Sequence, residues 1–192
     1  MMAITLSAMI RLTYISPFYD KLKNLPIFID SELNIEATAF QDNQIFLFNR
    51  KKNLVLKFDY RDFLRFIKEE IDFPQPEIKE FSLPKINGIE AGFSGATTLK
   101  NQSKIIFTAS VEDNLIAYDD GEILGSFIGT IDISNNKISA TFDCCAIPNT
   151  DEKFKVESVT VEEETSPGIT KVVLITDDDQ GHSSIIEGIL SW

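Results

Sequence analysis

Asn34-Ile35-Glu36-Ala37 is the first of three similar tetrapeptides in this chain, the others being Gly88-Ile89-Glu90-Ala91 and Lys155-Val156-Glu157-Ser158. Each places an aliphatic residue, a glutamate and a small residue at the start of a predicted strand. A second apolar strand follows each time, as in Ile45-Phe46-Leu47-Phe48-Asn49. The glutamates stand 54 and 67 positions apart. This spacing suits a repeat of four-stranded units that carry loop insertions.

Alternation of apolar and polar residues with a period of two surrounds these motifs, as is typical of half-buried strands. Asn135-Asn136 predicts a hairpin turn, because asparagine tolerates the positive φ angles of tight turns. One helix is predicted over 60–70, with Asp59 as its N-cap. The predicted strands are 9–15, 34–40, 44–49, 54–59, 77–83, 89–99, 104–111, 123–133, 137–142, 154–162, 170–177 and 183–190.

Short strands with an internal repeat predict an all-β fold, and more narrowly a partial β-propeller of about three four-stranded blades with one short α-helix. The whole chain, 1–192, forms a single propeller-like domain in this interpretation. Its parts are an N-terminal strand and connection (1–32), a first blade with the helix (33–84), a second blade (85–145) and a third blade (153–192). The third blade shows only three strands, so its fourth strand is either the segment 9–15 or absent.

Composition limits the partners. The chain has 30 Asp and Glu against 18 Lys and Arg, a formal net charge of −12. This charge repels nucleic acid and anionic membranes, so neither is an expected partner. No apolar run is long enough to span a membrane, and 1–10 lacks the basic start and cleavage site of a signal peptide. A soluble protein is predicted, with its compartment left open. The two cysteines are too few for a thiolate metal site.

The repeated glutamates are the strongest candidate site. On equivalent inner strands, Glu36, Glu90 and Glu157 would converge on a central channel, and grouped carboxylates require a cation, a basic partner or raised pKa values. Oxygen ligands suit calcium. Calcium is therefore the candidate cofactor, with Glu36, Glu90, Glu157 and Asp177 as its predicted ligands. The alternative is that each glutamate pairs with an amide or a basic side chain and fixes the packing of the sheets.

Arg50, Glu112 and Asp113 are the predicted ligand-binding residues. Arg50 is the best anchor for a phosphate or carboxylate, because its guanidinium group can bind either with two hydrogen bonds. Pairing of Arg50 with Glu36 or Glu90 is the alternative. Glu112 and Asp113 directly follow the predicted strand 104–111, and Asp113 is expected on the same face as the acidic turn Asp119-Asp120-Gly121-Glu122.

A family resemblance rests on segments spread over about 16–192, namely Leu33-Asn34-Ile35-Glu36, Phe48-Asn49-Arg50, Gly92-Phe93-Ser94-Gly95-Ala96-Thr97, Phe107-Thr108-Ala109-Ser110-Val111-Glu112-Asp113, Ala117-Tyr118-Asp119-Asp120-Gly121-Glu122-Ile123-Leu124-Gly125-Ser126-Phe127-Ile128-Gly129, Val156-Glu157-Ser158-Val159 and Thr176-Asp177-Asp178-Asp179. These segments resemble uncharacterised bacterial six-bladed β-propellers related to the SdiA-regulated and esterase-like phytase propellers. The resemblance implies the C-terminal half of such a propeller and no established activity. Ala37 stands where the family usually has glycine.

The sequence is compatible with three functional hypotheses. The first is a non-enzymatic binding or interaction module whose acidic central mouth takes a cation or small ligand. The second is a phytase-like, calcium-dependent phosphoester hydrolase, in which metal-bound water attacks a phosphate oriented by Arg50. Binding is favoured, because the basic residues near the acids are confined to Arg50, Lys51 and Lys52. A position of this cluster beside the glutamates would favour hydrolysis.

The third hypothesis is a truncated half-propeller without independent activity. An incomplete propeller exposes edge strands, and such edges pair readily with another copy. Self-association through exposed edge strands is therefore expected, with two half-propellers closing one ring.

Overall fold

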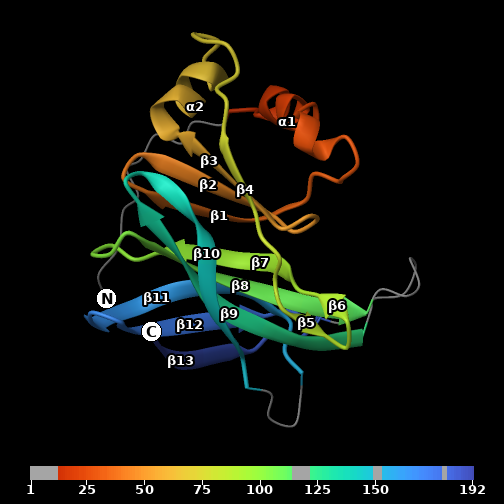
Figure 1. The fold of residues 1–192 in the computed structure, drawn as a ribbon, viewed down its shortest axis with the longest axis vertical. Helices are drawn as coiled ribbons and strands as arrows, with labels where there is room; N and C mark the ends of the chain where they lie inside the picture. Colours follow the sequence, from red (N-terminus) through yellow and green to blue (C-terminus); the bar gives the residue numbers. More distant parts are fainter. Residues whose placement is uncertain (1–12, 114–121, 149–152, 179–180) are drawn as a thin grey trace, which may run out of the picture.

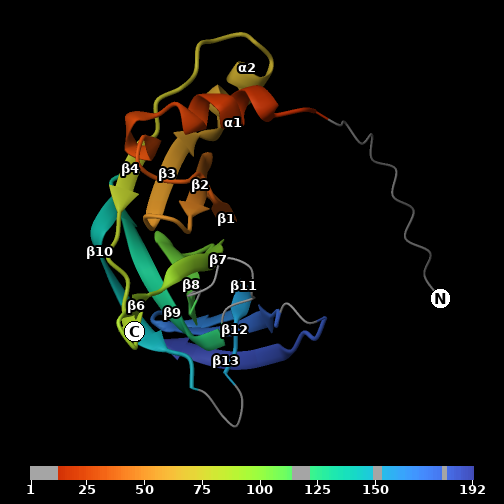
Figure 2. The same ribbon diagram turned by 90° about the vertical axis from the view of Figure 1, so that its right-hand side faces the viewer.

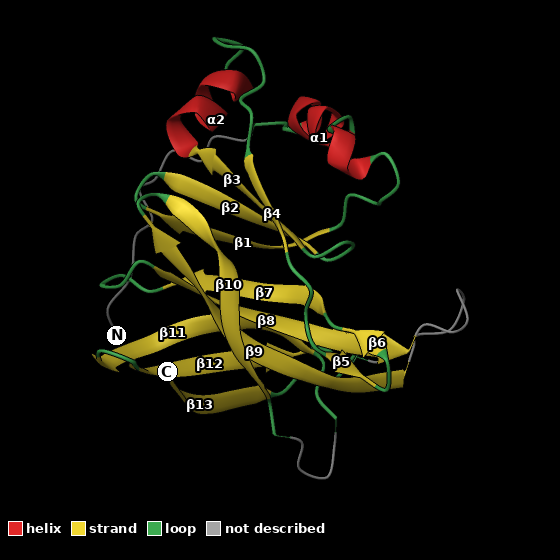
Figure 3. Cartoon of the chain, in the orientation of Figure 1, coloured by secondary structure: helices red, strands yellow, loops and turns green. Residues whose placement is uncertain are grey.

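The structure is a computed structural model that describes residues 13–113, 122–148, 153–178 and 181–192. Within these ranges the chain is all-β, as predicted, with four antiparallel sheets and two short α-helices (Figures 1 and 3). No helix in the described ranges is both long and apolar enough to cross a membrane.

The first sheet is a four-stranded meander in which sequence neighbours pair antiparallel. The β1–β2 turn is closed by Asp42 and Asn43 at φ angles of 48° and 62°, which aspartate and asparagine tolerate better than most residues. Its strands are β1 (Ile35–Gln41), β2 (Gln44–Asn49), β3 (Leu54–Asp59) and β4 (Glu77–Glu80).

The second sheet has the same sequential order, and its last hairpin turns at Asn135 and Asn136, at φ angles of 50° and 59°. The predicted hairpin is therefore confirmed. Its strands are β7 (Gly92–Thr98), β8 (Lys104–Asp113), β9 (Glu122–Ser134) and β10 (Lys137–Ala146). The short pair β5 (Lys85–Ile86) and β6 (Ile89–Glu90) precedes it. The predicted strand 89–99 is thus interrupted at Ala91, whose N–H donates instead to the carbonyl of Pro84.

The third sheet has three strands, as the sequence predicts for this part of the chain. They are β11 (Val156–Ser166), β12 (Ile169–Thr176) and β13 (Ile185–Ser191), again paired antiparallel in sequence order. The three large sheets follow one another along the long axis of the molecule, and their first strands are neighbours, with β1 against β7 and β7 against β11 (Figure 2).

Apolar layers hold the three sheets together. Between the first and second sheets, Phe48 and Phe93 meet edge to face at 5.1 Å, and Phe93 meets Phe107 at 5.3 Å. Such ring pairs add to the stabilisation that burial of their apolar area provides. The layer between the second and third sheets is aliphatic and is made by Leu99, Ile106, Ile128, Val156, Val159, Val172 and Leu174, with Ile147 beside them.

The outer face of the first sheet is covered by helices. Phe58 of β3 packs edge to face against Phe18 of α1 (Ser16–Lys23), and Phe63 of α2 (Tyr60–Ile67) packs against the same phenylalanine. Asp59 caps α2 as predicted, accepting hydrogen bonds from two backbone N–H groups. The helix ends earlier than the predicted residue 70, because Glu69 takes a left-handed φ of 60°.

The N-terminal prediction needs correction. Thr13, Tyr14 and Ile15 are not strand and lead directly into α1, while residues 9–12 of the predicted strand lie outside the described part of the chain. The 3-10 turn η1 (Pro26–Phe28) follows. Pro17 favours a helix start at this point, since its fixed φ suits the first turn. The described ranges therefore contain two α-helices where one was predicted.

Candidate functional site

The β2–β3 turn, residues 50–53, carries three consecutive basic residues and is held rigidly by the asparagine before it. Asn49 is fully buried, and its side-chain oxygen accepts from the backbone N–H of Asn34 at 2.6 Å. Its amide nitrogen donates to the carbonyl of Glu32 at 3.3 Å and to that of Lys51. A buried side-chain amide satisfied in this way fixes the path of the turn.

Asn53, at the other end of this turn, joins the first sheet to the second. Its amide nitrogen donates to the carbonyl of Ala91 at 2.8 Å and to Glu90 Oε1 at 3.3 Å. Its side-chain oxygen accepts from the N–H of Phe93 at 3.2 Å. Glu90 Oε1 also accepts from the N–H of Leu83 at 2.8 Å. The basic turn is therefore anchored on the segment that enters β7.

Arg50 extends from this turn across Gly92 toward β8. A methyl group on Gly92 would lie 2.5 Å from Arg50 Cγ, so the glycine allows the arginine stem to rest on the strand. Arg50 Nη2 donates to Glu112 Oε1 at 2.8 Å, with only 17% and 14% of the two side chains exposed. Lys155, just before β11, lies 3.3 Å from the same carboxylate oxygen. One glutamate thus connects all three large sheets.

Glu157 lies beside this group, with Lys155 Nζ 3.6 Å from its Oε1. That oxygen is buried and accepts no hydrogen bond from any residue that the structure describes. Burial raises the pKa of the Glu157 carboxyl; Lys155 and Arg50 act against this, whereas the carboxylates of Glu36 and Glu112 add to it. The native state therefore holds a carboxylate here whose charge is disfavoured by its surroundings.

We expect Glu157→Gln to stabilise the protein at pH 7. A carboxyl whose pKa is higher in the folded than in the unfolded state stabilises the native state at low pH. That contribution is lost as pH rises from the unfolded pKa through the folded one. Glutamine keeps the shape without the charge, so its advantage is expected in urea unfolding at pH 7 and should shrink toward pH 4.

The control is Glu162→Gln, which changes an exposed glutamate on the same strand. It should leave the free energy of unfolding nearly unchanged at both pH values. A Glu157→Gln protein that is less stable than the wild type at pH 7 would show that attraction to Lys155 and Arg50 outweighs burial.

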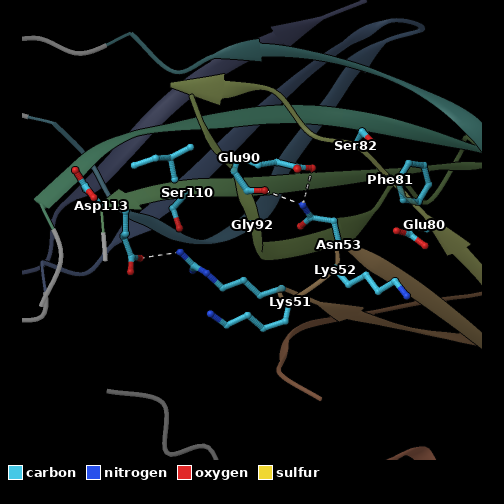
Figure 4. Close-up of a pocket in the computed structure, with 14 residues that line it drawn as sticks. Lys51, Lys52, Asn53, Glu80, Phe81, Ser82, Glu90, Gly92, Ser110 and Asp113 are labelled. Carbon is cyan, nitrogen blue, oxygen red and sulfur yellow. Dashed lines mark hydrogen bonds and ion pairs between the residues drawn. The ribbon is translucent and has the colours of Figure 1, made fainter. Parts of the chain in front are cut away.

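A pocket of about 630 Å³ opens between the basic turn and the edge of the second sheet (Figure 4). Its charged lining residues are Arg50, Lys51, Lys52, Glu80, Glu90, Glu112 and Asp113, with Ser110 beside them. In Figure 4 Glu80 is drawn on the same side as Lys52, and Asp113 lies apart from both lysines. Ser110 is 1% exposed, and its buried hydroxyl has no hydrogen-bond partner among the described residues. Neither Lys51 nor Asp113 has a side-chain ion pair with any described residue. The pocket is therefore lined by both signs of charge, with Lys51 and Asp113 as its charged groups that have no ion pair within the described ranges.

Strand register corrects the predicted equivalence of the three glutamates. The pairing slips by one residue between Ile35 and Ala37 in β1, between Phe93 and Gly95 in β7, and between Val156 and Ser158 in β11. The residues at these irregularities are Glu36, Ser94 and Glu157. Glu90 lies before β7 and is not the counterpart of the other two, since Ser94 occupies that place. The buried Ser94 hydroxyl donates to the carbonyl of Val156 at 2.6 Å.

The four predicted calcium ligands do not form one group. Glu36 and Glu157 share an electrostatic neighbourhood, Glu90 is bound to Asn53 across the pocket, and the backbone N–H of Asp177 donates to the carbonyl of Lys155. The described ranges contain no set of three Asp, Glu, His or Cys side chains placed to hold a metal ion. By contrast, the predicted ligand-binding residues Arg50, Glu112 and Asp113 all line one pocket. The partner of Arg50 is Glu112, where Glu36 or Glu90 was the predicted alternative.

Sequence reasoning missed three contributors to this site. Lys155 is the first residue of one of the repeated tetrapeptides, but the repeat itself points only to the glutamate that the three copies share. Asn53 follows two lysines between strands, a turn pattern that indicates positive φ but not a contact with another sheet. Ser110 lies within an apolar strand, and no sequence signal marks its hydroxyl as unpartnered.

Stacked antiparallel sheets with a charged pocket across their first junction define an all-β protein with a candidate ligand-binding site. The chain belongs to a family of unknown function, DUF6929, whose model matches residues 2–190. No curated protein and no solved structure matches the chain. The family match gives no link to the SdiA-regulated or phytase-like propellers.

Proposed function

We propose that this chain is part of a β-propeller that acts as a binding module, and that the pocket beside Arg50 takes a small zwitterionic ligand. Three features support the propeller architecture: each large sheet is a meander of consecutive strands, the sheets pack face to face, and their first strands are neighbours. Inner strands of adjacent blades have this relation in propellers. The resemblance to six-bladed propellers points the same way.

The opposed charges of the pocket carry the functional proposal. Lys51 offers hydrogen-bond donors to a carboxylate, and Asp113 can accept from an ammonium group. Arg50 and Glu112 also line the pocket but are paired with each other at 2.8 Å. Asn49 and Asn53 hold the basic side in place, so little conformational entropy is lost on binding.

Binding is preferred to calcium-dependent hydrolysis on the chemistry of the acids. The basic cluster does lie beside Glu90 and Glu112, as hydrolysis also requires. A calcium ion, however, takes six to eight oxygen ligands. Of the carboxylates that line this pocket, Glu90 is bound to Asn53 and Glu112 to Arg50 and Lys155 within the described part of the chain.

Thermal unfolding in the presence of small solutes tests the proposal. Free amino acids at saturating concentration should raise the unfolding midpoint, because a ligand that binds only the native state stabilises it by mass action. At one hundred times Kd the gain is about 2.7 kcal/mol, roughly 5–10 °C for a chain of this size. Lys51→Ala and Asp113→Ala should each abolish the shift.

Lys68→Ala, at the C-cap of α2 and outside the pocket, is the control and should keep the shift. Amino acids that leave the wild-type midpoint unchanged would contradict the proposal. A shift caused by millimolar calcium, lost in a Glu36→Gln, Glu90→Gln, Glu157→Gln variant, would favour the hydrolase instead.

A further inference from the structure

The outer face of the third sheet is left uncovered by every element that the structure describes. Along β13, exposed and half-buried residues alternate, and Ile186 and Leu190 turn toward the second sheet. Ile185 and Ile189 point the other way and are 73% and 72% exposed. Ile175 on β12, paired with Ile185, is 44% exposed on the same face. Exposed isoleucines gathered on one face of a regular sheet are typical of an interaction surface.

The opposite end of the molecule is closed. The corresponding outer face of the first sheet is buried under α1, η1 and α2, which pack on Leu47, Leu54, Leu56 and Phe58. Figures 1 and 2 show the helices at one end of the row of sheets and β11–β13 at the other. The described chain therefore presents a single uncovered sheet face.

We propose that this face packs against the same face of a second copy, giving a dimer with two-fold symmetry. A contact between two different surfaces would need a second exposed apolar face on each copy. The outer face of the first sheet cannot serve, because the helices cover it. A surface that meets itself gives a closed, two-fold contact. Closure of a ring from two half-propellers would instead require the outer face of the first sheet.

The face is compatible with contact between two copies. Strand register places Lys171 beside Ile189 and Glu187 beside Val173, so both signs of charge lie among the isoleucines. Lys171 Nζ lies 2.9 Å from Glu163 Oε2 of its own chain. A two-fold rotation can also bring the lysine of this pair against Glu187 of the other copy while isoleucines meet isoleucines. Sheet faces already pack on one another twice within the chain. The second copy would repeat that packing with the surface that remains.

Sedimentation velocity of the full chain at about 1–100 µM tests the dimer. The wild type is expected to shift from monomer to dimer over this range. Ile189→Lys should weaken association by more than about tenfold, as loss of a central apolar contact does in protein interfaces. Ile29→Lys is the matched control, because Ile29 is 79% exposed but lies at the end of η1 on the helical side. It should associate like the wild type.

Each remaining outcome overturns the proposal. A wild type that is monomeric at 100 µM shows that this face does not bind a second copy. A dimer that Ile189→Lys leaves intact shows that the two copies associate through another surface, such as the strand edges. A dimer broken equally by Ile29→Lys places the contact at the helical end. The circular dichroism spectra of both variants should match that of the wild type. If Ile189→Lys alone loses strand signal, the same experiment is done with Ile185→Lys.

Discussion

Gly95→Ala is expected to destabilise the protein by about 3 kcal/mol, at the upper end of the usual range for an overpacked core. A methyl group at this position would lie 2.5 Å from Thr108 Oγ1, 2.9 Å from the Cα of Ser158 and 3.2 Å from the carbonyl oxygen of Glu157. Thr108 is a buried, β-branched residue with little rotational freedom, and the other two atoms are backbone. The second and third sheets would therefore have to separate.

Gly188→Ala is the matched control for this experiment. Gly188 is also a strand glycine, but a methyl group there would make only an ordinary contact, 3.7 Å from Val172 Cγ2. In urea unfolding its midpoint should stay close to that of the wild type. Equal midpoints for the two variants would mean that β7 and β11 can move apart at little cost, and that their close approach is not required for the fold.

Asn53→Ala is expected to cost about 2–4 kcal/mol and to abolish ligand binding. Its side chain is 5% exposed and makes three hydrogen bonds to the segment entering β7. Without it, the N–H of Phe93 and the carbonyl of Ala91 lose their partner, and an unsatisfied buried polar group costs about 1–3 kcal/mol. The basic turn would also be released from the second sheet.

Asn87→Ala separates the backbone effect from the side-chain effect. Asn87 adopts a similar positive φ of 52° in the β5–β6 turn but is exposed, with no side-chain hydrogen bond within the described structure. Both variants place alanine in a left-handed conformation, so the difference between their free energies of unfolding reports the contribution of the Asn53 side chain. A difference near zero would show that the anchor between the sheets contributes nothing.

The sequence predicts most of the strands because their residues alternate between a buried and an exposed side. The hairpin at Asn135 and Asn136 follows from the tolerance of asparagine for positive φ. Segment 13–15 misleads because Thr13, Tyr14 and Ile15 favour strands locally. The helix that follows depends on burial of Phe18 and Leu22 against a sheet formed later in the sequence. Tertiary contacts of this kind override local preference.

The candidate site was only partly predictable, for a reason visible in the repeat. Glu36 and Glu157 do hold equivalent places in their strands. Glu90 belongs to a similar tetrapeptide, but the residue in the equivalent place is Ser94, four positions later. An irregularity in strand pairing has no sequence signature as clear as a turn. The grouping of Arg50, Glu112 and Lys155 depends on how three sheets meet, and spacing along the chain does not define that arrangement.

Each large sheet is made from one uninterrupted stretch of chain, and this order matters while the protein is being synthesised. β1 to β4 and the helices that cover them are complete by residue 80, before any strand of the second sheet has emerged from the ribosome. Folding can then proceed vectorially, each new sheet condensing on the one before. Of these three sheets the third would form last, and its isoleucine-bearing face would be the last of their apolar surfaces to be made.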